Sequence, residues 1–535
     1  MPTFSEALEL MRLNDLGYLY MLLMVWSGTA IAIYLADRRG WARSVFKWSA
    51  PAAVPLAAAV INPLAGLLAA GAALATRIRI SLVNPLPYIV GLAALLRIPA
   101  IFGSLWFDET FTSRLINLPG ANFWPAIMAD VHPPLYYLLL KPLAFLDSPA
   151  LLRVTSLLVG LWGIVLVHRL VKALGLGDNV ANMTALLWAL MPAHIYYSTE
   201  LRSYALMVNL VLAMMLAILQ DRPGRFTVWL ASIVWIHNAG IFYAGVFGLA
   251  ALTMNWNRRW LRAVLVGGTV GALWIPFMLA QAANVAQDHW AYINAGMVFW
   301  PITTMTIGNQ GDFAGLTIVV VAAITLLALV RMHPFLLFTG RGLLLLAAMF
   351  AVPVIEIVLS LVWRPTYIWR HMLPCALLLT IPWAYLLVKT PRARLVFAPT
   401  LALALVGLYT YWLPQSRPDY RAWLADACPG ATQAYATSIN AAFIVSENSE
   451  MLVTVWPGAW DNGRSIRPED IGKFGYGSTP LLASACILQI DIPHSQQAER
   501  DFLASLALEQ VGEHRLGQWA VYYVWRAAKL NGPGA

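Results

Sequence analysis

Charged side chains are scarce in this chain: Asp, Glu, Lys and Arg together make up 11% of its 535 residues. A soluble domain carries roughly 25% charged residues, because polar groups must cover its surface. The scarcity excludes a soluble globular protein. Hydrophobic residues make up 60% of the chain and gather in runs near the ~20 residues that cross a bilayer, so the sequence predicts a polytopic membrane protein.

Cysteine is scarce as well, with three in the whole chain. So few cysteines exclude a disulfide scaffold, and no Cys-x-x-Cys or Cys/His spacing indicates a zinc site. Cys428 and Cys486 both lie in the polar C-terminal part of the chain. There they could form a disulfide in an oxidising compartment, or stay two unpaired, buried cysteines.

The net charge of +9 comes from short basic clusters between the apolar runs. Because positive loops stay on the cytoplasmic side, such clusters set the topology of the chain and do not indicate a nucleic-acid surface. The runs predict membrane spans at 82–105, 151–171, 180–197, 204–219, 261–280, 316–330, 342–362, 372–388 and 395–413.

The same loop charges place two further segments. Basic clusters at both ends of the segment 225–257 demand an even number of crossings, so we expect two short helices broken at residues 237–240. The apolar segment 133–146 is short for a span, and counting it as one would invert every later loop charge. We expect it to form a helix that lies along the outer interface of the membrane.

The composition divides the chain into three parts. Residues 1–81 are predicted to be N-terminal membrane segments, and residues 82–413 a membrane-embedded module. Residues 414–535 gain Asp, Gln, Ser and Gly, so they are predicted to form a small α/β domain outside the membrane. Its expected strands are the alternating apolar runs at 441–445, 452–456, 487–490 and 520–525.

The predicted topology brings ionisable residues from distant loops to the outer face, where such groups are costly unless paired or functional. They are Asp108, Glu109, Asp130, His132, Glu200, Arg202, His237, Arg364, Arg370 and His371. Plain structural roles are also open. The acidic pair could cap a helix, Glu200 and Arg202 could pair with each other, and the tyrosines after His132 could belong to an interfacial belt.

The aromatic and basic segment 363–371 could likewise be an interfacial anchor. Its Arg370, however, has the planar fork that binds a phosphate through two hydrogen bonds. Asp, Glu and His side chains could also hold a metal ion, but no local ligand spacing such as His-Glu-x-x-His is present. A divalent cation is therefore an open alternative and not a requirement.

The order of these motifs resembles a known family. An acidic pair follows an early span, an Asp-x-His-Pro-Pro-Leu-Tyr-Tyr element starts at Asp130, and a Ser-x-Glu-x-Arg-x-Tyr-Ala element starts at Ser198. His237 between two short helices and Arg370 before a late span complete the set. Together they resemble the bacterial branch of the GT-C glycosyltransferases, near the protein O-mannosyltransferases and the lipid A aminoarabinose transferase.

The resemblance covers residues 82–413 and departs from the family pattern at two positions. Thr199 stands where the family usually has Gln, and His371 follows Arg370 where relatives commonly have Tyr. Both departures concern the contacts with the lipid phosphate and leave the class of protein unchanged.

The resemblance implies an all-α polytopic membrane protein with about 12 to 13 transmembrane helices, here followed by the small C-terminal α/β extracytoplasmic domain. It also implies a polyprenyl-phosphate monosaccharide as donor and no required cofactor. The sugar would pass to a lipid, glycan or protein acceptor on the outer face of the inner membrane. A phosphate leaving group is best met by preorganised cations, and the acceptor hydroxyl needs a base.

Roles for individual residues follow from this chemistry. Asp108 is the expected base, because it directly follows a span and matches the early acidic position of the family; Glu109 is the second candidate. Arg370, assisted by Arg202 or His371, is expected to bind the phosphate. The expected substrate-binding residues are Asp130, His132, Tyr136, Glu200, Arg202, Tyr204, His237, Arg370 and His371.

Two other classes of protein compete with this interpretation. A transporter or flippase for a lipid-linked sugar would have inverted repeats and charges near the midplane of the bilayer, whereas the charges here gather at outer helix ends. A non-catalytic membrane partner with an outer binding domain would leave the clustered carboxylates and arginines without a task.

The topology can be tested by cysteine labelling in intact cells. In a variant without the native cysteines, a single cysteine near Asp130 should react with an impermeant thiol reagent added from outside. A single cysteine near Arg259 should react only after the cells are opened, because the basic loop is cytoplasmic. The opposite pattern would overturn the orientation on which the functional interpretation depends.

Overall fold

The computed structural model describes most of the chain after residue 84. It covers 85–285, 314–363, 366–394, 419–436, 449–455, 475–476, 486–491, 508–516 and 520–527, with isolated positions elsewhere. The predicted N-terminal membrane segments, Arg364 and nearly all of the predicted span at 395–413 lie outside the described residues.

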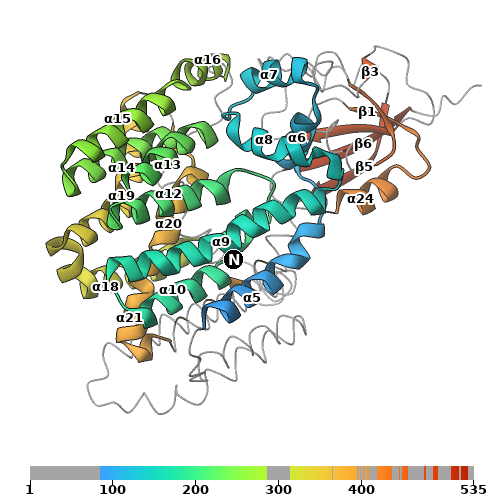
Figure 1. The fold of residues 1–535 in the computed structure, drawn as a ribbon. Coiled ribbons are helices and arrows are strands. Elements are labelled where there is room, and N and C mark those ends of the chain that lie inside the picture. Colours follow the sequence, from blue (N-terminus) through green and yellow to red (C-terminus); the bar gives the residue numbers. More distant parts are fainter. Residues whose placement is uncertain are drawn as a thin grey trace, which may run out of the picture.

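Helices form the body of the described chain (Figure 1). The first part contains α5 (Leu86–Arg97), η1 (Ile98–Phe102), α6 (Phe107–Asn117), α7 (Gly120–Ala129), α8 (Leu135–Leu140), η2 (Lys141–Leu146), α9 (Pro149–Leu174), α10 (Asp178–Leu190), α11 (Pro192–Tyr197) and α12 (Tyr204–Leu219). The second part contains α13 (Pro223–Ile236), α14 (Gly240–Met254), α15 (Arg258–Ala272), α16 (Ile275–Val285), α18 (Ala314–Phe338), α19 (Gly340–Val362), η4 (Trp369–Met372), α20 (Leu373–Leu378), α21 (Thr380–Lys389) and η5 (Pro391–Ala393).

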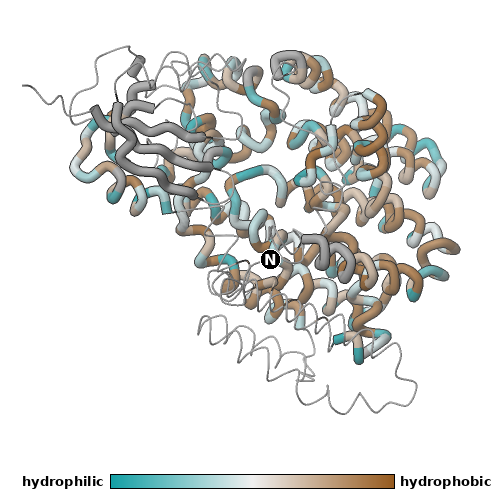
Figure 2. Tube along the Cα trace, turned by 180° about the vertical axis from the view of Figure 1, so that it is seen from behind, coloured by the Kyte–Doolittle hydropathy of each residue, from teal (hydrophilic) through white to brown (hydrophobic). Residues whose placement is uncertain are grey.

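Five helical stretches among the described residues are long and apolar enough to cross a membrane. They are Pro149–Leu174, Arg258–Ala282, Val321–Phe338, Gly340–Val362 and Trp369–Lys389. Figure 2 shows hydrophobic residues along most of the helical bundle, with hydrophilic residues gathered at the turns. The prediction of an all-α polytopic membrane protein is confirmed.

The predicted spans at 180–197 and 316–330 differ from the observed helices. The predicted helix at 180–197 is interrupted after α10, because Pro192 has no amide hydrogen to offer the carbonyl of Trp188. The fully buried side chain of Arg97, on α5, replaces the missing donors. Its guanidinium donates to the carbonyls of Trp188 and Ala189 at 3.2 and 3.0 Å. The predicted span at 316–330 is also too short, since α18 continues through the basic residues to Phe338.

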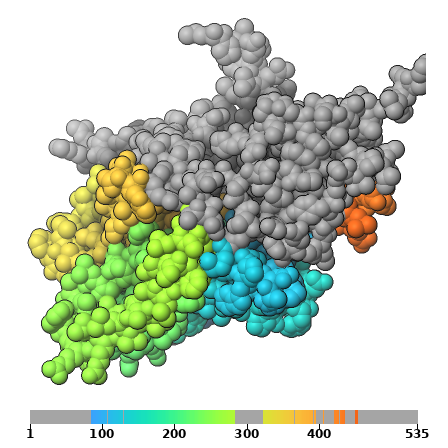
Figure 3. Space-filling model, turned by 90° about the horizontal axis from the view of Figure 1, so that it is seen from above, coloured from blue at the N-terminus to red at the C-terminus, as the bar shows by residue number. Residues whose placement is uncertain are grey.

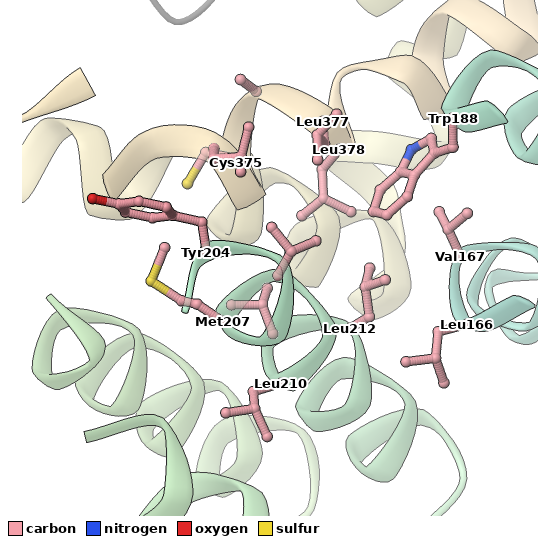
Figure 4. Close-up of a cluster of buried hydrophobic side chains, with 14 of the residues drawn as sticks. Leu166, Val167, Trp188, Tyr204, Met207, Leu210, Leu212, Cys375, Leu377 and Leu378 are labelled. Atoms are coloured by element: carbon pink, nitrogen blue, oxygen red, sulfur yellow. The ribbon is translucent and has the colours of Figure 1, made fainter. Parts of the chain in front are cut away.

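The core that supports the site lies where α9, α10, α12 and α20 meet (Figure 4). Leu166, Trp188, Met207 and Leu377 are buried there with their neighbours. Tyr204 lies at the edge of this cluster, and Figure 4 shows its hydroxyl pointing away from the leucines. The first turn of α12 is therefore held by apolar packing on one side, while its polar end is left for the site.

The short helices α6, α7 and α8 lie between the bundle and a sheet (Figure 1). The segment 133–146 is helical as expected, although its place along the membrane interface stays a prediction. α7 packs against α16, and Figure 3 shows the segments near residues 125 and 280 side by side when seen from above. Helices α7 and α16, which are far apart in the sequence, thus lie in contact on one side of the bundle.

The C-terminal part forms a mixed sheet preceded by α24 (Tyr420–Ala427). Its strand order is β3-β2-β1-β4-β6-β5, in which β1 pairs in parallel with β2 and β4, and β6 pairs antiparallel with β4 and β5. The strands are β1 (Gln433–Ala436), β2 (Leu452–Val455), β3 (Gly475–Tyr476), β4 (Cys486–Asp491), β5 (Leu508–Leu516) and β6 (Ala520–Ala527).

Three of the predicted strand runs match this sheet, as β2, β4 and β6. Of the run at 441–445 only Val445 is described, and it is helical. Cys428 is disulfide-bonded, which excludes the alternative that it is an unpaired thiol, whereas Cys375 is free and buried. The location of the domain outside the membrane stays a prediction.

The expected break at 237–240 is confirmed, because α13 ends at Ile236 and α14 begins at Gly240. The break requires glycine: a Cβ at Gly240 would lie 2.1 Å from the carbonyl oxygen of Ile233. Bulk at this position would therefore force the two helix ends apart.

Gly240→Ala should destabilise the protein by about 1–3 kcal/mol, as expected for overpacking against rigid backbone. Gly245→Ala on the same helix is the matched control, since a Cβ there meets nothing within 4 Å. Thermal unfolding of both variants in detergent measures the difference. Equal midpoints for the two variants would show that the helix ends tolerate the added atom.

Candidate active site

Asp108 lies at the centre of the predicted constellation. It occupies the first turn of α6, where the helix dipole favours a carboxylate. Its Oδ2 accepts a 3.0 Å hydrogen bond from Nη1 of Arg370, and Nε of Arg202 lies 3.9 Å from the same oxygen. The Asp108 side chain is 21% exposed, so this carboxylate is reachable while it faces two guanidinium groups.

Arg370 enters from η4, far along the chain. Its guanidinium lies over the rings of Trp106 and Trp369, at 5.1 and 5.5 Å from their centroids. Cation–π contacts of this kind hold a guanidinium in place without consuming its N–H groups. Asp108 takes one N–H group of Arg370, and the planar fork offers further donors to an anion.

Arg202 connects the other loops of the site. It lies in the turn between α11 and α12 and is buried. Its Nη1 donates to the carbonyl of Asp108 at 3.3 Å and to the hydroxyl of Thr112 at 3.2 Å, while Nη2 lies 3.1 Å from Nε2 of His132. Arg202 therefore ties the start of α6 to the loop that follows α7.

Asp130 and His132 occupy that loop and are both buried or nearly so. The hydroxyl of Tyr137 donates to Asp130 at 2.7 Å. Burial raises the pKa of Asp130, but His132, Arg202 and the Tyr137 hydroxyl outweigh burial and hold it below its usual value. Burial and the charge of Arg202 lower the pKa of His132. The pair is thus a carboxylate beside a neutral imidazole at neutral pH.

Three histidine rings form a row beside these groups. The ring of His237 lies 5.4 Å from that of His132 and 4.9 Å from that of His371, between ring centroids. Tyr204 lies against the same ring at 5.6 Å. Burial, followed by the charges of His371, His132 and Arg202, lowers the pKa of His237 well below its usual value.

The second candidate for the base, Glu109, lies elsewhere. It is fully buried, and Arg153 on α9 holds both of its oxygens, with Nε donating to Oε1 at 2.8 Å. The backbone N–H of Leu201 donates to Oε1 as well, at 2.8 Å. Glu109 thus occupies a buried ion pair with Arg153.

The remaining expected substrate-binding residues lie near the site in supporting positions. Glu200 is buried in the turn before α12, close enough to Arg370 and Tyr197 for its charge to act on both. Tyr136 is buried on α8 beside Tyr137, with ring centroids 5.9 Å apart. The structure therefore brings together Asp108, Asp130, His132, Arg202, Tyr204, His237, Arg370 and His371.

The sequence analysis missed several residues that hold these groups in place. Nε2 of Gln281 donates to the carbonyls of Ile127 and His132 at 2.7 and 3.1 Å, and Asn238 donates to the carbonyl of Val131 at 2.9 Å. Asn238 stood in the predicted helix break, which was a usable signal. Gln281 lies in an apolar run without any motif.

Glu356 was missed as well, although a carboxylate in the middle of an apolar run is a signal in itself. It lies on α19, is fully buried, and its Oε2 is 3.2 Å from Nδ1 of His371. Within the described part of the chain, no group of three or more His, Cys, Asp or Glu side chains could hold a metal ion. The chemistry open to the described site is anion binding by two arginines and proton acceptance by Asp108.

The fold of the chain resembles that of a protein solved in two states. The chain is similar to ArnT from Cupriavidus metallidurans, solved in the apo state and bound to undecaprenyl phosphate. The TM-scores are 0.52 and 0.50, at 13% sequence identity over 84% of this chain and 99% of ArnT. No family model matches the chain, and no curated protein matches it.

The buried histidines should make stability depend on pH. The unfolded imidazoles titrate near 6.5, whereas His132 and His237 titrate lower in the folded state, so both gain protons more readily when the chain unfolds. Stability should therefore be complete above pH 6.5 and fall as the pH drops below it. We expect the thermal midpoint in detergent to decrease between about pH 7.5 and about pH 5.5.

His237→Asn should show a smaller decrease over this range. His333→Asn should keep the decrease of the native protein, because His333 is exposed on α18. A native midpoint that does not change with pH would contradict the lowered pKa of His132 and His237.

Proposed function

We propose that this chain is a membrane glycosyltransferase that moves a sugar from a polyprenyl-phosphate donor to an acceptor of the cell envelope. The observation that carries the proposal is the contact of Asp108 with Arg370 and Arg202, in which one carboxylate shares a site with two anion-binding groups. Similarity in fold to ArnT bound to undecaprenyl phosphate supports a lipid phosphate as the ligand of these arginines. The reaction face is proposed to lie outside the inner membrane.

In this proposal the two arginines bind the donor phosphate. Arg370 is placed by Trp106 and Trp369, and Arg202 by Asp108 and Thr112, so both cations are in position before the donor arrives. Such preorganised charge stabilises the phosphate as it leaves the sugar. A departing phosphate gains negative charge, and rigid guanidinium groups meet that charge without rearrangement.

Asp108 is proposed to take the proton of the acceptor hydroxyl. The hydroxyl oxygen attacks the anomeric carbon, the bond from that carbon to the phosphate oxygen breaks, and the proton passes to the Asp108 carboxylate. A positioned general base contributes typically 10²–10⁴-fold to the rate. Asp108 is preferred to Glu109 because Arg153 already occupies both oxygens of Glu109.

The transporter alternative receives less support from the described residues. Asp108, Arg202 and Arg370 stand at helix ends, not near the middle of spanning helices. Transport also gives no reason to place a carboxylate against the anion-binding arginines.

Asp108→Asn should reduce sugar transfer about 10²–10⁴-fold, because the amide cannot accept the proton. Binding of undecaprenyl phosphate should persist, since both arginines remain. Turnover with a set of radiolabelled polyprenyl-phosphate sugars, and affinity for undecaprenyl phosphate, should be measured on one purified preparation.

Asp178→Asn is the matched control, because Asp178 is exposed at the start of α10 and pairs only with the exposed Lys172 among the described residues. It should transfer sugar at the native rate. Near-native transfer by Asp108→Asn would exclude Asp108 as the base, and an inactive native protein with all donors would count against the proposed class.

A further inference from the structure

His237 presents a buried hydrogen-bond donor without a protein acceptor. Its Nδ1 accepts the backbone N–H of Ala239 at 3.2 Å, so the proton of the neutral ring lies on Nε2. The side chain is 3% exposed, and Nε2 has no hydrogen-bond partner within the described residues. Leaving such a group unsatisfied costs about 1–3 kcal/mol, which a ligand could recover.

His371 presents the opposite group. Its Nδ1 lies 3.2 Å from Oε2 of Glu356, and because a carboxylate accepts hydrogen bonds, Nδ1 carries the ring proton. A ring whose one proton lies on Nδ1 has a hydrogen-bond acceptor at Nε2. The hydroxyl of Tyr243 donates to the carbonyl of His371 at 2.7 Å and fixes its backbone.

The two rings are neighbours, with centroids 4.9 Å apart and planes at 77°. One ring offers an N–H and the other a lone pair. A phosphate oxygen accepts hydrogen bonds only and is suited to Arg202 and Arg370. A hydroxyl group both accepts and donates, and it is the chemical group that fits one donor and one acceptor side by side.

We propose that His237 and His371 together bind a hydroxyl group of the donor sugar. Nε2–H of His237 donates to the hydroxyl oxygen, and the hydroxyl proton is donated to Nε2 of His371. The inference rests on the proposed function and divides its donor site in two: the arginines bind the phosphate, and the histidine pair recognises the sugar.

Glu356 acts in this site as a positioning residue. It is a fully buried carboxylate on a helix long enough to span the membrane, and its Oε1 has no hydrogen-bond partner among the residues described. A contact that only joined α19 to η4 would be served as well by two apolar side chains, since buried ion pairs are often replaced by them without loss of stability. The carboxylate has the further effect of keeping the proton of His371 on Nδ1.

The test compares two ligands, undecaprenyl phosphate and undecaprenyl phosphate bearing the sugar that supports turnover. In His237→Asn the side-chain oxygen can still accept the N–H of Ala239, but the ring that reaches the sugar is lost. Affinity for the sugar-bearing lipid should fall about five- to tenfold, the worth of one buried hydrogen bond. Affinity for undecaprenyl phosphate should stay within about twofold of the native value.

Glu356→Leu should show the same selectivity, and ¹⁵N spectra of labelled histidines should show that His371 no longer keeps its proton on Nδ1. Arg370→Lys should weaken both ligands, because it removes the fork that binds phosphate. Thr325→Val is the control, because it also removes a buried hydrogen-bonding group. The hydroxyl of Thr325 accepts a hydrogen bond from Trp383 at 3.0 Å, away from the site. It should change neither affinity.

Equal loss of both ligands in His237→Asn and Glu356→Leu, or no loss of either, would overturn the division of the site. An effect confined to the KM of the acceptor would overturn the assignment of the hydroxyl to the donor. If the native protein bound neither lipid, the proposed function itself would fail, and this inference with it.

Discussion

The buried ion pair between Glu109 and Arg153 is the interaction on which the site depends. It joins the first turn of α6 to the N-terminal end of α9, and Arg153 also bonds the carbonyls of Ile101 and Ser104, at 3.1 and 2.9 Å. A charge pair inside an apolar body cannot drift, because separating its members would leave two unpaired charges in a medium of low dielectric. Asp108 directly precedes Glu109 in the chain. The buried ion pair of Glu109 therefore fixes the position of the partly exposed Asp108 carboxylate.

The sequence predicted which residues gather, and it did so from loop charge. Asp130, Arg202 and His371 belong to distant segments that the loop charges assign to one face of the membrane, and the structure brings the three residues into one site. The partners of these residues could not be predicted in the same way. Arg153 and Glu356 lie within apolar runs, and the contact of Arg153 with Glu109 spans 44 residues of chain, which no local pattern encodes. The helix break at 237–240 was predicted because the basic clusters on both sides demand an even number of crossings, and the break at Pro192 was missed because a single proline interrupts an apolar run.

Charged and uncharged basic side chains lie next to each other in the site. Arg202 and Arg370 surround Asp108, while burial keeps His132 and His237 uncharged beside them. Positive histidines there would add repulsion to the arginines and would compete for the same anion. Neutral rings can instead make directional hydrogen bonds with uncharged groups of a ligand. The described site thus combines charged and neutral hydrogen-bonding groups in a single cluster of basic residues.

Arg97 has a consequence for how the protein is made. Three of its acceptors, the carbonyls of Trp188 and Ala189 and the hydroxyl of Ser198, are synthesised about ninety to a hundred residues later. An arginine costs up to roughly 2.5–3.5 kcal/mol on entering the bilayer, the value for the centre of a lone helix, and Arg97 is the last residue of α5. The apolar segment that carries Arg97 can therefore reach its final depth without this penalty only after α10 and α11 have been synthesised. The insertion of α5 thus depends on the synthesis of two later helices.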